Sequence, residues 1–591
     1  MVMDWPSGEL YVAAEFADGE PSRIEWIDAD RLLALAPQRP GSQEGVDDDE
    51  RKRRPKIIAS PLYRFNGRGY YFDRPAQLWS IDLGTLPSDE GTKPGDVPVA
   101  IGAIGVDHES FAVDPDGSAV VAIASVHDDD RVAGGSRLLR YDVGRADDGT
   151  VAASGPTVLT PAAGSWAELL WHPADGLFVI GSDDLSTVEF NRLYRVDPSV
   201  TEAPTEVAFD DVNITVGPST GAAVDGGILA VGPRRGRVAI DRYSTGQGGD
   251  GSRTVVYEDD STVVAFAADS TGTTVVAAIT SAVRPAELYR IDGGAGGAAI
   301  RLVTLNEELL SELDLVEPEA VAVTSADGTV VEAFVTRPPA SAPDTGTLRP
   351  GLVYVHGGPM FQYGHFFFDE FQIAAALGYV VIGGNPRGSD GYGEAWARDI
   401  IANFGNRDWQ DVQAITGHLA ELPEVDAERI GIGGGSYGGF MTCWALGHDG
   451  AGRYKAGLVE RSVVDFVSMT GTSDIGHSFV TRYLGASIDD DPDKILRQSP
   501  LTYAHTISVP TLVLHSEEDW RCPIEQAERL HATIHRNKAK GGSSILVRFP
   551  AENHELSRSG QPRHRVERFE IIHEFYARHL GGADLETSHL S

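Results

Sequence analysis

The pattern of the sequence changes near residue 306, and this change constrains the fold more than any other feature of the chain. Before it, short apolar runs are separated by turns rich in Asp, Gly and Pro. After it, apolar runs that are typical of buried strands alternate with segments of helical periodicity. A chain of 591 residues is also too long for a single hydrophobic core. We therefore expect an all-β domain over residues 1–306 and an α/β domain over residues 307–591.

The first domain contains a loose repeat. An apolar strand followed by a turn recurs at DWPSGELYV (from residue 4), FAVDPDGSAVVAIA (111), LLWHPADGLFVIG (169) and FAADSTGTTVVAAI (266). A second element closes each unit at QLWSID (77), RLLRYD (137), RLYRVD (192) and ELYRID (287), with a weaker copy at RVAIDRY (237). This period predicts the four-stranded blades of a β-propeller. A β-sandwich is the competing interpretation, but it does not explain the recurring pairs.

The second domain alternates strands and helices. The predicted strands are GLVYVHGG (351–358), YVVIGGNPRG (379–388), RIGIGGGS (429–436), PTLVLHS (510–516) and SILVRFP (544–550). The predicted helices include FQIAAALG (371–378), DWQDVQAITGHLAEL (408–422), FMTCWALG (440–447), PIEQAERLHATIH (523–535) and RVERFEIIHEFYARHL (565–580). This alternation predicts a mainly parallel sheet with helices on both faces. Functional residues are expected at the carboxyl ends of its strands.

The composition argues against several kinds of partner. The formal net charge of −38 opposes binding to nucleic acid or anionic membranes. No apolar run reaches eighteen residues, so no transmembrane helix is expected. The segment MVMDWPSGELYV lacks the basic and apolar regions of a secretory signal. Cys443 and Cys522 are the only cysteines, too few for a disulfide framework or a cysteine-based zinc cluster. We expect a cytoplasmic protein.

The acidic residues are spread along the whole chain, and only seven of the 49 basic residues are lysine. This pattern is typical of proteins from salt-loving organisms, in which screening at high salt reduces the self-repulsion of the surface. An acidic protein from an arginine-favouring genome is the alternative. Instability at low salt would favour the halophilic interpretation.

The segment Gly434-Gly435-Ser436-Tyr437-Gly438 fits the pattern G-x-S-x-G between a predicted strand and a predicted helix. This is the setting of a nucleophile elbow, where small neighbours let strand and helix approach closely. The following helix directs its positive N-terminal end toward the serine. A glycine-rich turn with an incidental serine is the alternative, and the strand–turn–helix context argues against it.

A nucleophilic serine needs a base, and the base needs an orienting acid. In this fold class the chain order is Ser, acid, His. The loop after strand 510–516 offers three acids, and spacing alone does not select one: Glu517, Glu518 and Asp519. The loop after strand 544–550 offers His554 as the base. The other late histidines lie in strand or helical runs and are expected to be structural or solvated: His515, His531, His535, His564 and His573.

Acyl transfer also needs two N–H donors for the oxyanion. One is expected from the backbone of Tyr437, which follows the nucleophile. The other is expected from the HGGP segment (356–359), through Gly357 or Gly358, because a Gly-Gly pair exposes its backbone N–H groups. Taken alone, HGGP could also be an ordinary turn after a strand.

The sequence resembles the prolyl oligopeptidase family of serine peptidases, and within it the acylaminoacyl-peptidase and dipeptidyl-peptidase-like branch. The matching segments are HGGPMFQYG (356–364), NPRGSDGYGEAW (385–396), GGGSYGGFMTCW (433–444), GTSDIG (471–476), HSEEDWRCPIEQAE (515–528) and ENHELSRSGQP (552–562). The resemblance implies an N-terminal β-propeller followed by an α/β-hydrolase domain. The family's propellers usually have seven blades, whereas five or six units are visible here. An incomplete or shorter propeller, a misassigned start, or a gap filled by a partner chain would each account for this difference.

The resemblance implies roles for the residues of the catalytic triad. Ser436 is the nucleophile, His554 the base and Asp519 the acid. It selects Asp519 over Glu518, because the family's acid lies two residues before an arginine. That arginine, here Arg521, is implied to hold a backbone carbonyl of the substrate, for which a charged guanidinium is suited.

The resemblance also implies Gly358 and Tyr437 as the oxyanion donors. The stretch 465–485 is implied to line the pocket for the side chain that precedes the cleaved bond. Phe466 and Phe479 are candidate contacts there, and core packing is the alternative role for both. No metal ion or organic cofactor is implied.

We therefore predict a serine peptidase that hydrolyses short peptides through an acyl-enzyme. It would act as an acylaminoacyl peptidase or like a dipeptidyl peptidase. Two alternatives stay open: a carboxylesterase with little peptidase activity, and an inactive propeller-based binding protein. Short peptides are the expected partners, without nucleic acid or membrane, and a homo-oligomer is one option for assembly.

Overall fold

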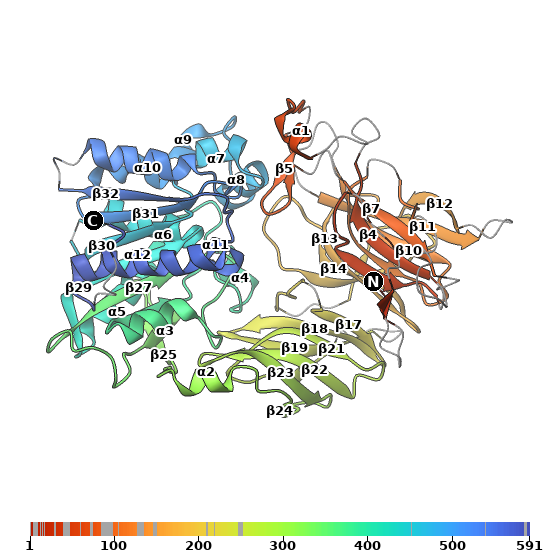
Figure 1. Ribbon diagram of the computed structural model, residues 1–591, viewed down its shortest axis with the longest axis horizontal. Coiled ribbons are helices and arrows are strands. Elements are labelled where there is room, and N and C mark those ends of the chain that lie inside the picture. The colour runs from red at the N-terminus through yellow and green to blue at the C-terminus, as the bar shows by residue number, and fades with distance from the viewer. Residues whose placement is uncertain are drawn as a thin grey trace.

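The chain forms two parts, a β-rich one and an α/β one, which lie side by side in Figure 1. The computed structural model describes residues 2–3, 10–11, 14, 16, 18–28, 31–39, 48–58, 61–70, 75–83, 98–103, 106–126, 135–145, 151–207, 211–217, 219–245, 252–450, 452–537, 539, 541–583 and 588–590. Within these residues, no helix is both long enough and apolar enough to cross a bilayer.

The β-rich part is built from antiparallel sheets of four strands, two of which are joined into one eight-stranded sheet by a bridge between β19 and β21. The strands of the first three sheets are β3 (Arg23–Trp26), β4 (Arg31–Pro37), β7 (Ala76–Asp82) and β8 (Val99–Ala100); β9 (His108–Val113), β10 (Ala119–Val126), β11 (Gly135–Arg145) and β12 (Val151–Val158); β13 (Ser165–His172), β14 (Gly176–Ser182), β15 (Arg192–Val196) and β16 (Thr205–Glu206). The joined pair contains β17 (Gly221–Val224), β18 (Gly227–Arg234), β19 (Arg237–Ser244), β20 (Arg253–Tyr257), β21 (Thr262–Ala268), β22 (Thr274–Ser281), β23 (Arg284–Asp292) and β24 (Ala299–Arg301).

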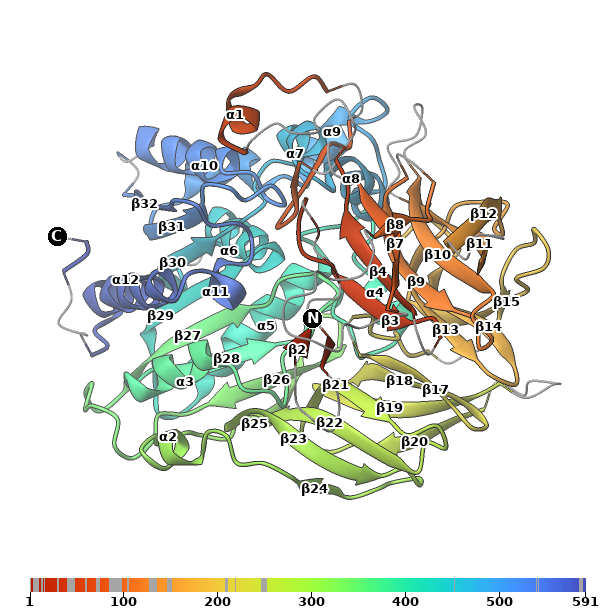
Figure 2. The same cartoon turned by 45° about the vertical axis from the view of Figure 1, so that its right-hand side comes forward.

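These units confirm the predicted propeller, and Figure 2 shows them following one another around the β-rich part. The described residues hold five such units. The predicted strand–turn elements are the first and second strands of their blades, as in β9–β10, β13–β14 and β21–β22. The expectation that the second repeated element closes each unit is wrong. That element is the third strand in every case (β7, β11, β15, β19 and β23), and a fourth strand follows it.

Smaller elements complete this part of the chain. Two short antiparallel pairs are β1 (Val2–Met3) with β2 (Leu10–Tyr11), and β5 (Arg64–Phe65) with β6 (Gly69–Tyr70). The predicted repeat at DWPSGELYV coincides partly with β2, but residues 4–9 lie outside the described residues. The short helices α1 (Asp48–Arg53) and α2 (Glu307–Ser311) lie before β5 and after β24. The expected domain boundary at residue 306 falls directly before α2.

The α/β part contains one eight-stranded sheet in the order β25-β26-β28-β27-β29-β30-β31-β32. Its strands are β25 (Glu319–Thr324), β26 (Val330–Thr336), β27 (Arg349–Val355), β28 (Val380–Gly384), β29 (Val425–Gly435), β30 (Tyr454–Glu460), β31 (Pro510–Ser516) and β32 (Ser543–Phe549). From β28 to β32 all neighbours are parallel, and β25 and β26 add an antiparallel edge. This arrangement confirms the predicted α/β-hydrolase domain. Strands β25, β26 and β30 were not among the predicted elements.

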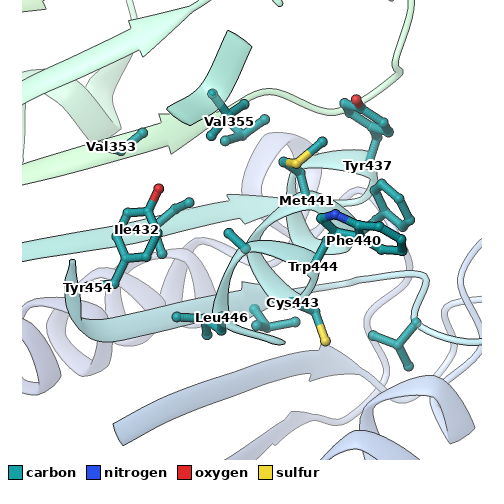
Figure 3. Close-up of a cluster of buried hydrophobic side chains, with 14 of the residues drawn as sticks. Val353, Val355, Ile432, Tyr437, Phe440, Met441, Cys443, Trp444, Leu446 and Tyr454 are labelled. Carbon is teal, nitrogen blue, oxygen red and sulfur yellow. The ribbon is translucent and has the colours of Figure 1, made fainter. Parts of the chain in front are cut away.

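Helices cover both faces of this sheet. One face is covered by α3 (Asp369–Ala376) and α12 (Pro562–Leu580), whose side chains Phe371, Phe575 and Tyr576 share one hydrophobic cluster. The other face is covered by α5 (Arg407–Glu421), α6 (Tyr437–His448) and α10 (Glu525–Arg536). Figure 3 shows side chains of α6 against Val355 of β27 and Ile432 of β29. Further helices are α4 (Glu394–Arg398), α7 (Phe466–Thr472), α8 (Gly476–Leu484), α9 (Pro492–Arg497), α11 (Leu556–Ser559) and two 3₁₀ turns at Pro500–Thr502 and Ala504–Thr506.

Candidate active site

Ser436 lies at a sharp bend between β29 and α6. Its backbone has φ 62° and ψ −122°, a positive-φ conformation that residues other than glycine adopt only under strain. A Cβ on Gly434 would lie 2.3 Å from the carbonyl oxygen of Val355, and one on Gly438 would lie 2.0 Å from the same oxygen. Both positions therefore require glycine, as the G-x-S-x-G pattern predicts. The Ser436 N–H donates to the carbonyl oxygen of Glu460 at 3.1 Å, which helps to hold the bend.

Asp519 and His554 lie beyond the ends of neighbouring strands. Asp519 follows β31 and His554 follows β32, and these two strands pair in parallel. The Nδ1 of His554 donates a hydrogen bond to Oδ2 of Asp519 at 2.7 Å. The other oxygen, Oδ1, accepts from the backbone N–H of Cys522 at 2.8 Å. The buried carboxylate thus orients the imidazole and leaves its Nε2 available as the proton acceptor.

Electrostatics favour a neutral imidazole beside an ionised carboxylate. Burial lowers the pKa of His554 below its ordinary value of 6.5, although Asp519 opposes this shift, and the charges of Arg461 and Arg521 lower the pKa further. Burial acts to raise the pKa of Asp519. The charge of His554, together with hydrogen bonds from His515 and His554, outweighs burial and holds that pKa below its usual range. This is the protonation state that a general base requires.

His515 is buried on β31, which fits the structural role expected for it, and it also lies beside the acid. Its Nε2 lies 2.6 Å from the carbonyl oxygen of Cys522 and 3.5 Å from Oδ2 of Asp519. The remaining late histidines lie on α10 and α12, at His531, His535, His564 and His573.

Ser436, His554 and Arg521 line one cavity of about 220 Å³. Cys522 also lines this cavity, and its thiol contacts the Ser436 side chain. Burial raises the pKa of the Cys522 thiol well above its usual range, so the thiol stays protonated at neutral pH. The fold thus brings the three residues of the predicted triad to a single site, although they come from three separate loops.

The HGGP segment follows β27 and lies beside the predicted nucleophile. A Cβ on Gly357 would lie 3.4 Å from Cβ of Ser436, and Gly358 lines the cavity. His356 holds the segment, with its Nδ1 2.7 Å from the Gly357 carbonyl oxygen and its Nε2 2.9 Å from Oγ of Ser389. The segment is therefore placed where an oxyanion donor is needed, and the role of the Gly358 N–H stays a prediction.

Tyr437 is the first residue of α6, so its backbone N–H lies at the positive end of the helix. Its side chain packs against Phe440 and donates a hydrogen bond from its hydroxyl to Oδ2 of Asp408 at 2.8 Å. These contacts keep the ring in the core and fix the first turn of the helix (Figure 3). The predicted role of Tyr437 as an oxyanion donor concerns the backbone alone.

Arg521 is held at the cavity by a carboxylate that the sequence did not point to. Its Nε donates to Oδ1 of Asp474 at 2.8 Å, and its Nη2 donates to Oδ2 of the same residue at 3.3 Å. The face of the guanidinium lies over the ring of Phe65, 5.1 Å from its centroid. These contacts orient the guanidinium on one side, and the role of its other N–H groups in holding a substrate carbonyl stays a prediction.

Apolar side chains make up much of the lining of this cavity. Phe466 and Phe479 both line it, as the stretch 465–485 predicts. Phe466 is almost fully buried, so it also serves the core. Further wall residues that the sequence did not point to are Phe404, Phe440, Val463, Met469 and Ile475.

A second, larger cavity of about 640 Å³ lies between the propeller and the α/β domain. The propeller contributes Arg68, Asp107 and Trp166 to its lining, and the α/β domain contributes Ile475 and Arg482. Ile475 lines both cavities, so the two spaces adjoin at this residue.

Residues 365–583 match the model of the prolyl oligopeptidase family. The matched residues lie within the C-terminal domain, which is thus similar to this family. The uncharacterized peptidase YuxL of Bacillus subtilis is 39% identical over 306 residues, which cover 52% of this chain and 45% of that protein. The acylamino-acid-releasing enzyme of Mus musculus is 30% identical over 225 residues, which cover 37% of this chain and 30% of that protein. The chain thus spans less than half the length of these curated relatives.

The likeness to solved structures extends beyond the family domain. The acylaminoacyl peptidase of Pyrococcus horikoshii superposes with a TM-score of 0.79 at 25% identity. The superposition covers 99% of this chain and 86% of that one. The likeness therefore includes the propeller as well as the α/β domain.

Proposed function

We propose that the protein is a serine peptidase that cleaves short peptides through a Ser436–His554–Asp519 triad. The observation that carries this proposal is the meeting of three features in one cavity. They are a serine at a strained bend, an imidazole hydrogen-bonded to a buried carboxylate, and a guanidinium held by a second carboxylate. The family match of the C-terminal domain supports the same reaction class.

In the proposed mechanism, Nε2 of His554 takes the hydroxyl proton of Ser436 as the oxygen attacks the substrate carbonyl. Asp519 stabilises the imidazolium that forms. The backbone N–H groups of Gly358 and Tyr437 donate to the oxyanion of the tetrahedral intermediate. His554 then protonates the leaving amine, and water hydrolyses the acyl-enzyme by the same route in reverse.

For the substrate, we propose peptides with a blocked N-terminus, cleaved to release an N-acylated amino acid. A free ammonium group would need an uncompensated carboxylate near the cavity. Among the described residues that line the smaller cavity, Glu555 is the one carboxylate, and it pairs with Arg558. Asp474 pairs with Arg521. The mouse relative is named an acylamino-acid-releasing enzyme and the Pyrococcus neighbour an acylaminoacyl peptidase, which supports this choice.

The experiment compares p-nitroanilides of acetyl-Ala, acetyl-Phe and a free dipeptide. We expect the acetylated substrates to be hydrolysed faster, and Ser436→Ala to lose about a million-fold in kcat. Ser199→Ala, an exposed serine of the propeller, is the matched control and should keep the full rate. Equal rates in wild type and Ser436→Ala would overturn the triad. Preference for the free dipeptide would indicate a dipeptidyl peptidase. Hydrolysis of a matched ester without hydrolysis of the amide would indicate a carboxylesterase.

We further propose that the enzyme works in a salt-rich cytoplasm. The formal charge of −38, with few lysines, supports this setting because salt screens the mutual repulsion of surface carboxylates. The assay is therefore best run across a range of salt concentrations. Loss of activity on raising the salt would contradict the proposal.

A further inference from the structure

A hairpin from the propeller domain reaches the loops that carry the proposed acid and base. Strands β5 and β6 form this hairpin, and Asn66 lies in the turn at its tip. Figure 1 shows β5 (red) next to α8 of the other domain. Arg64 attaches the hairpin to the end of the preceding helix, α7, because its Nη2 donates to the carbonyl oxygen of Thr472 at 2.8 Å.

The side chain of Asn66 contacts both catalytic loops. Its Oδ1 accepts a hydrogen bond from the backbone N–H of His554 at 3.2 Å and a longer one from that of Trp520 at 3.5 Å. Trp520 directly follows Asp519 in the chain. Both partners are N–H donors, so the amide oxygen of Asn66 is the atom that faces them. One propeller side chain thus bridges the loop of the acid and the loop of the base.

Neighbouring contacts fix the position of Asn66. Its backbone N–H donates to Oδ2 of Asp474 at 2.8 Å, the carboxylate that also holds the arginine at the cavity. The guanidinium of Arg64 lies over the ring of Trp520, 5.3 Å from its centroid. Tyr70 packs edge-on against the same ring at 5.4 Å. The tip of the hairpin is therefore held by several independent contacts rather than by one.

We propose that Asn66 is a positioning residue, whose amide oxygen fixes the His554 loop relative to the Asp519 loop. The inference rests on the proposed triad mechanism. Without this oxygen, two backbone N–H groups lose their acceptor, and the loops no longer share a common support. Displacements of about 1 Å at a reacting group lower rates by about 10²-fold. The propeller thereby contributes to the geometry of the triad itself, for every substrate.

The test measures kcat, KM and the rate at which a fluorophosphonate labels Ser436. Asn66→Ala is expected to lower kcat about 10- to 100-fold, while KM stays near the wild-type value because Arg521 and the apolar wall are unchanged. The labelling rate should fall by a similar factor, since the reagent needs the triad but not the larger cavity. Asn66→Asp keeps an acceptor oxygen and should restore most of the rate. Asn191→Ala removes an amide that donates within the propeller, to Ile214, and serves as the matched control.

Wild-type kcat and labelling in Asn66→Ala would overturn the proposal. It would also be overturned if Asn66→Asp lost as much as Asn66→Ala. If Asn66→Ala does not fold, the test depends on Asn66→Asp alone. A kcat near the wild-type value in Asn66→Asp supports the proposal, and a loss of about tenfold or more in that variant contradicts the proposed role of the acceptor oxygen. Failure of the proposed function can be told apart from failure of the role of Asn66. If the proposed function is wrong, the wild type itself lacks turnover that depends on Ser436.

Discussion

At the scale of single residues, the imidazole of His554 is governed by two opposing effects. Burial disfavours its charged form, and the carboxylate of Asp519 favours it. Burial and the nearby guanidinium groups win, so the pKa lies below 6.5 in the free enzyme. A base with such a pKa is neutral throughout the neutral range and is ready to accept the proton of Ser436.

This balance predicts the pH dependence of the reaction. The base works only when it is neutral, so kcat/KM rises with pH through the pKa of His554 and is lost as pH falls below it. We expect the midpoint of this acidic limb below pH 6.5, because the pKa of His554 is lowered from that value. The measurement is kcat/KM on an acetylated nitroanilide from pH 4 upward, at constant ionic strength. A midpoint above 6.5 would contradict the electrostatics described for the site.

The two aspartates of the site should have different kinetic effects. Asp519→Asn keeps the shape of the side chain but removes the charge that orients His554, so kcat should fall by about 10⁴-fold. Asp474→Asn weakens the support of Arg521, so its main effect should be a higher KM. Steady-state kinetics of both variants on one substrate provide the check. The assignment of roles is wrong if Asp474→Asn has the larger effect on kcat.

Motifs near single residues were predictable, and contacts across the chain were not. Ser436 and His554 could be selected because each lies in a loop next to an apolar strand. The choice of Asp519 over Glu518 needed the family pattern, because spacing left it open. Asn66 carried no sequence signal, since its partners lie more than 400 positions away and the contact depends on how the domains meet. His515 lies on a strand and was grouped with structural histidines for that reason.

At the scale of elements, the bend between β29 and α6 depends on the absence of side chains. The helix begins so close to β27 that its second residue, Gly438, would clash with a strand carbonyl if it carried a Cβ. The elbow is thus a property of two strands and one helix together. The G-x-S-x-G pattern predicts this elbow well, because the residues that must be small are close neighbours of the serine in the sequence.

The elbow predicts a contrast between two glycines in helices. Gly438→Ala places a Cβ 2.0 Å from the Val355 carbonyl oxygen, so we expect loss of activity and a lower melting temperature. Gly417→Ala lies on α5, where a Cβ would meet nothing within 4 Å. This control should keep full activity and gain about 0.5–1 kcal/mol in the free energy of unfolding. Equal behaviour of the two variants would contradict the close approach of helix and strand.

Other elements could not be predicted from the sequence pattern. The strand β30 was not predicted, because YKAGLVE is short and its apolar residues are interrupted by glycine and charged residues, yet it is buried between β29 and β31. The third strands of the blades were recognised as a repeat. Their place within each blade could not be predicted, because the fourth strands, such as β8 and β16, are short and lack a clear pattern.

At the scale of the whole molecule, the surface charge should govern stability. A net charge of −38 destabilises the compact state through self-repulsion, and salt screens this repulsion. We expect the melting temperature to rise steeply as NaCl increases toward about 1 M, where the Debye length falls to about 3 Å. Sorbitol at matched osmolality is the control, because it cannot screen charge. A melting temperature that does not change with salt would contradict the halophilic interpretation.

The proposed triad is tested most directly by covalent labelling of the native protein. The protein is treated with a fluorophosphonate at neutral pH, and the adduct is located by peptide mass spectrometry. The account predicts a single adduct on Ser436, absent in Ser436→Ala and formed far more slowly in His554→Ala. An adduct on another residue, or none at all in a folded sample, would contradict it.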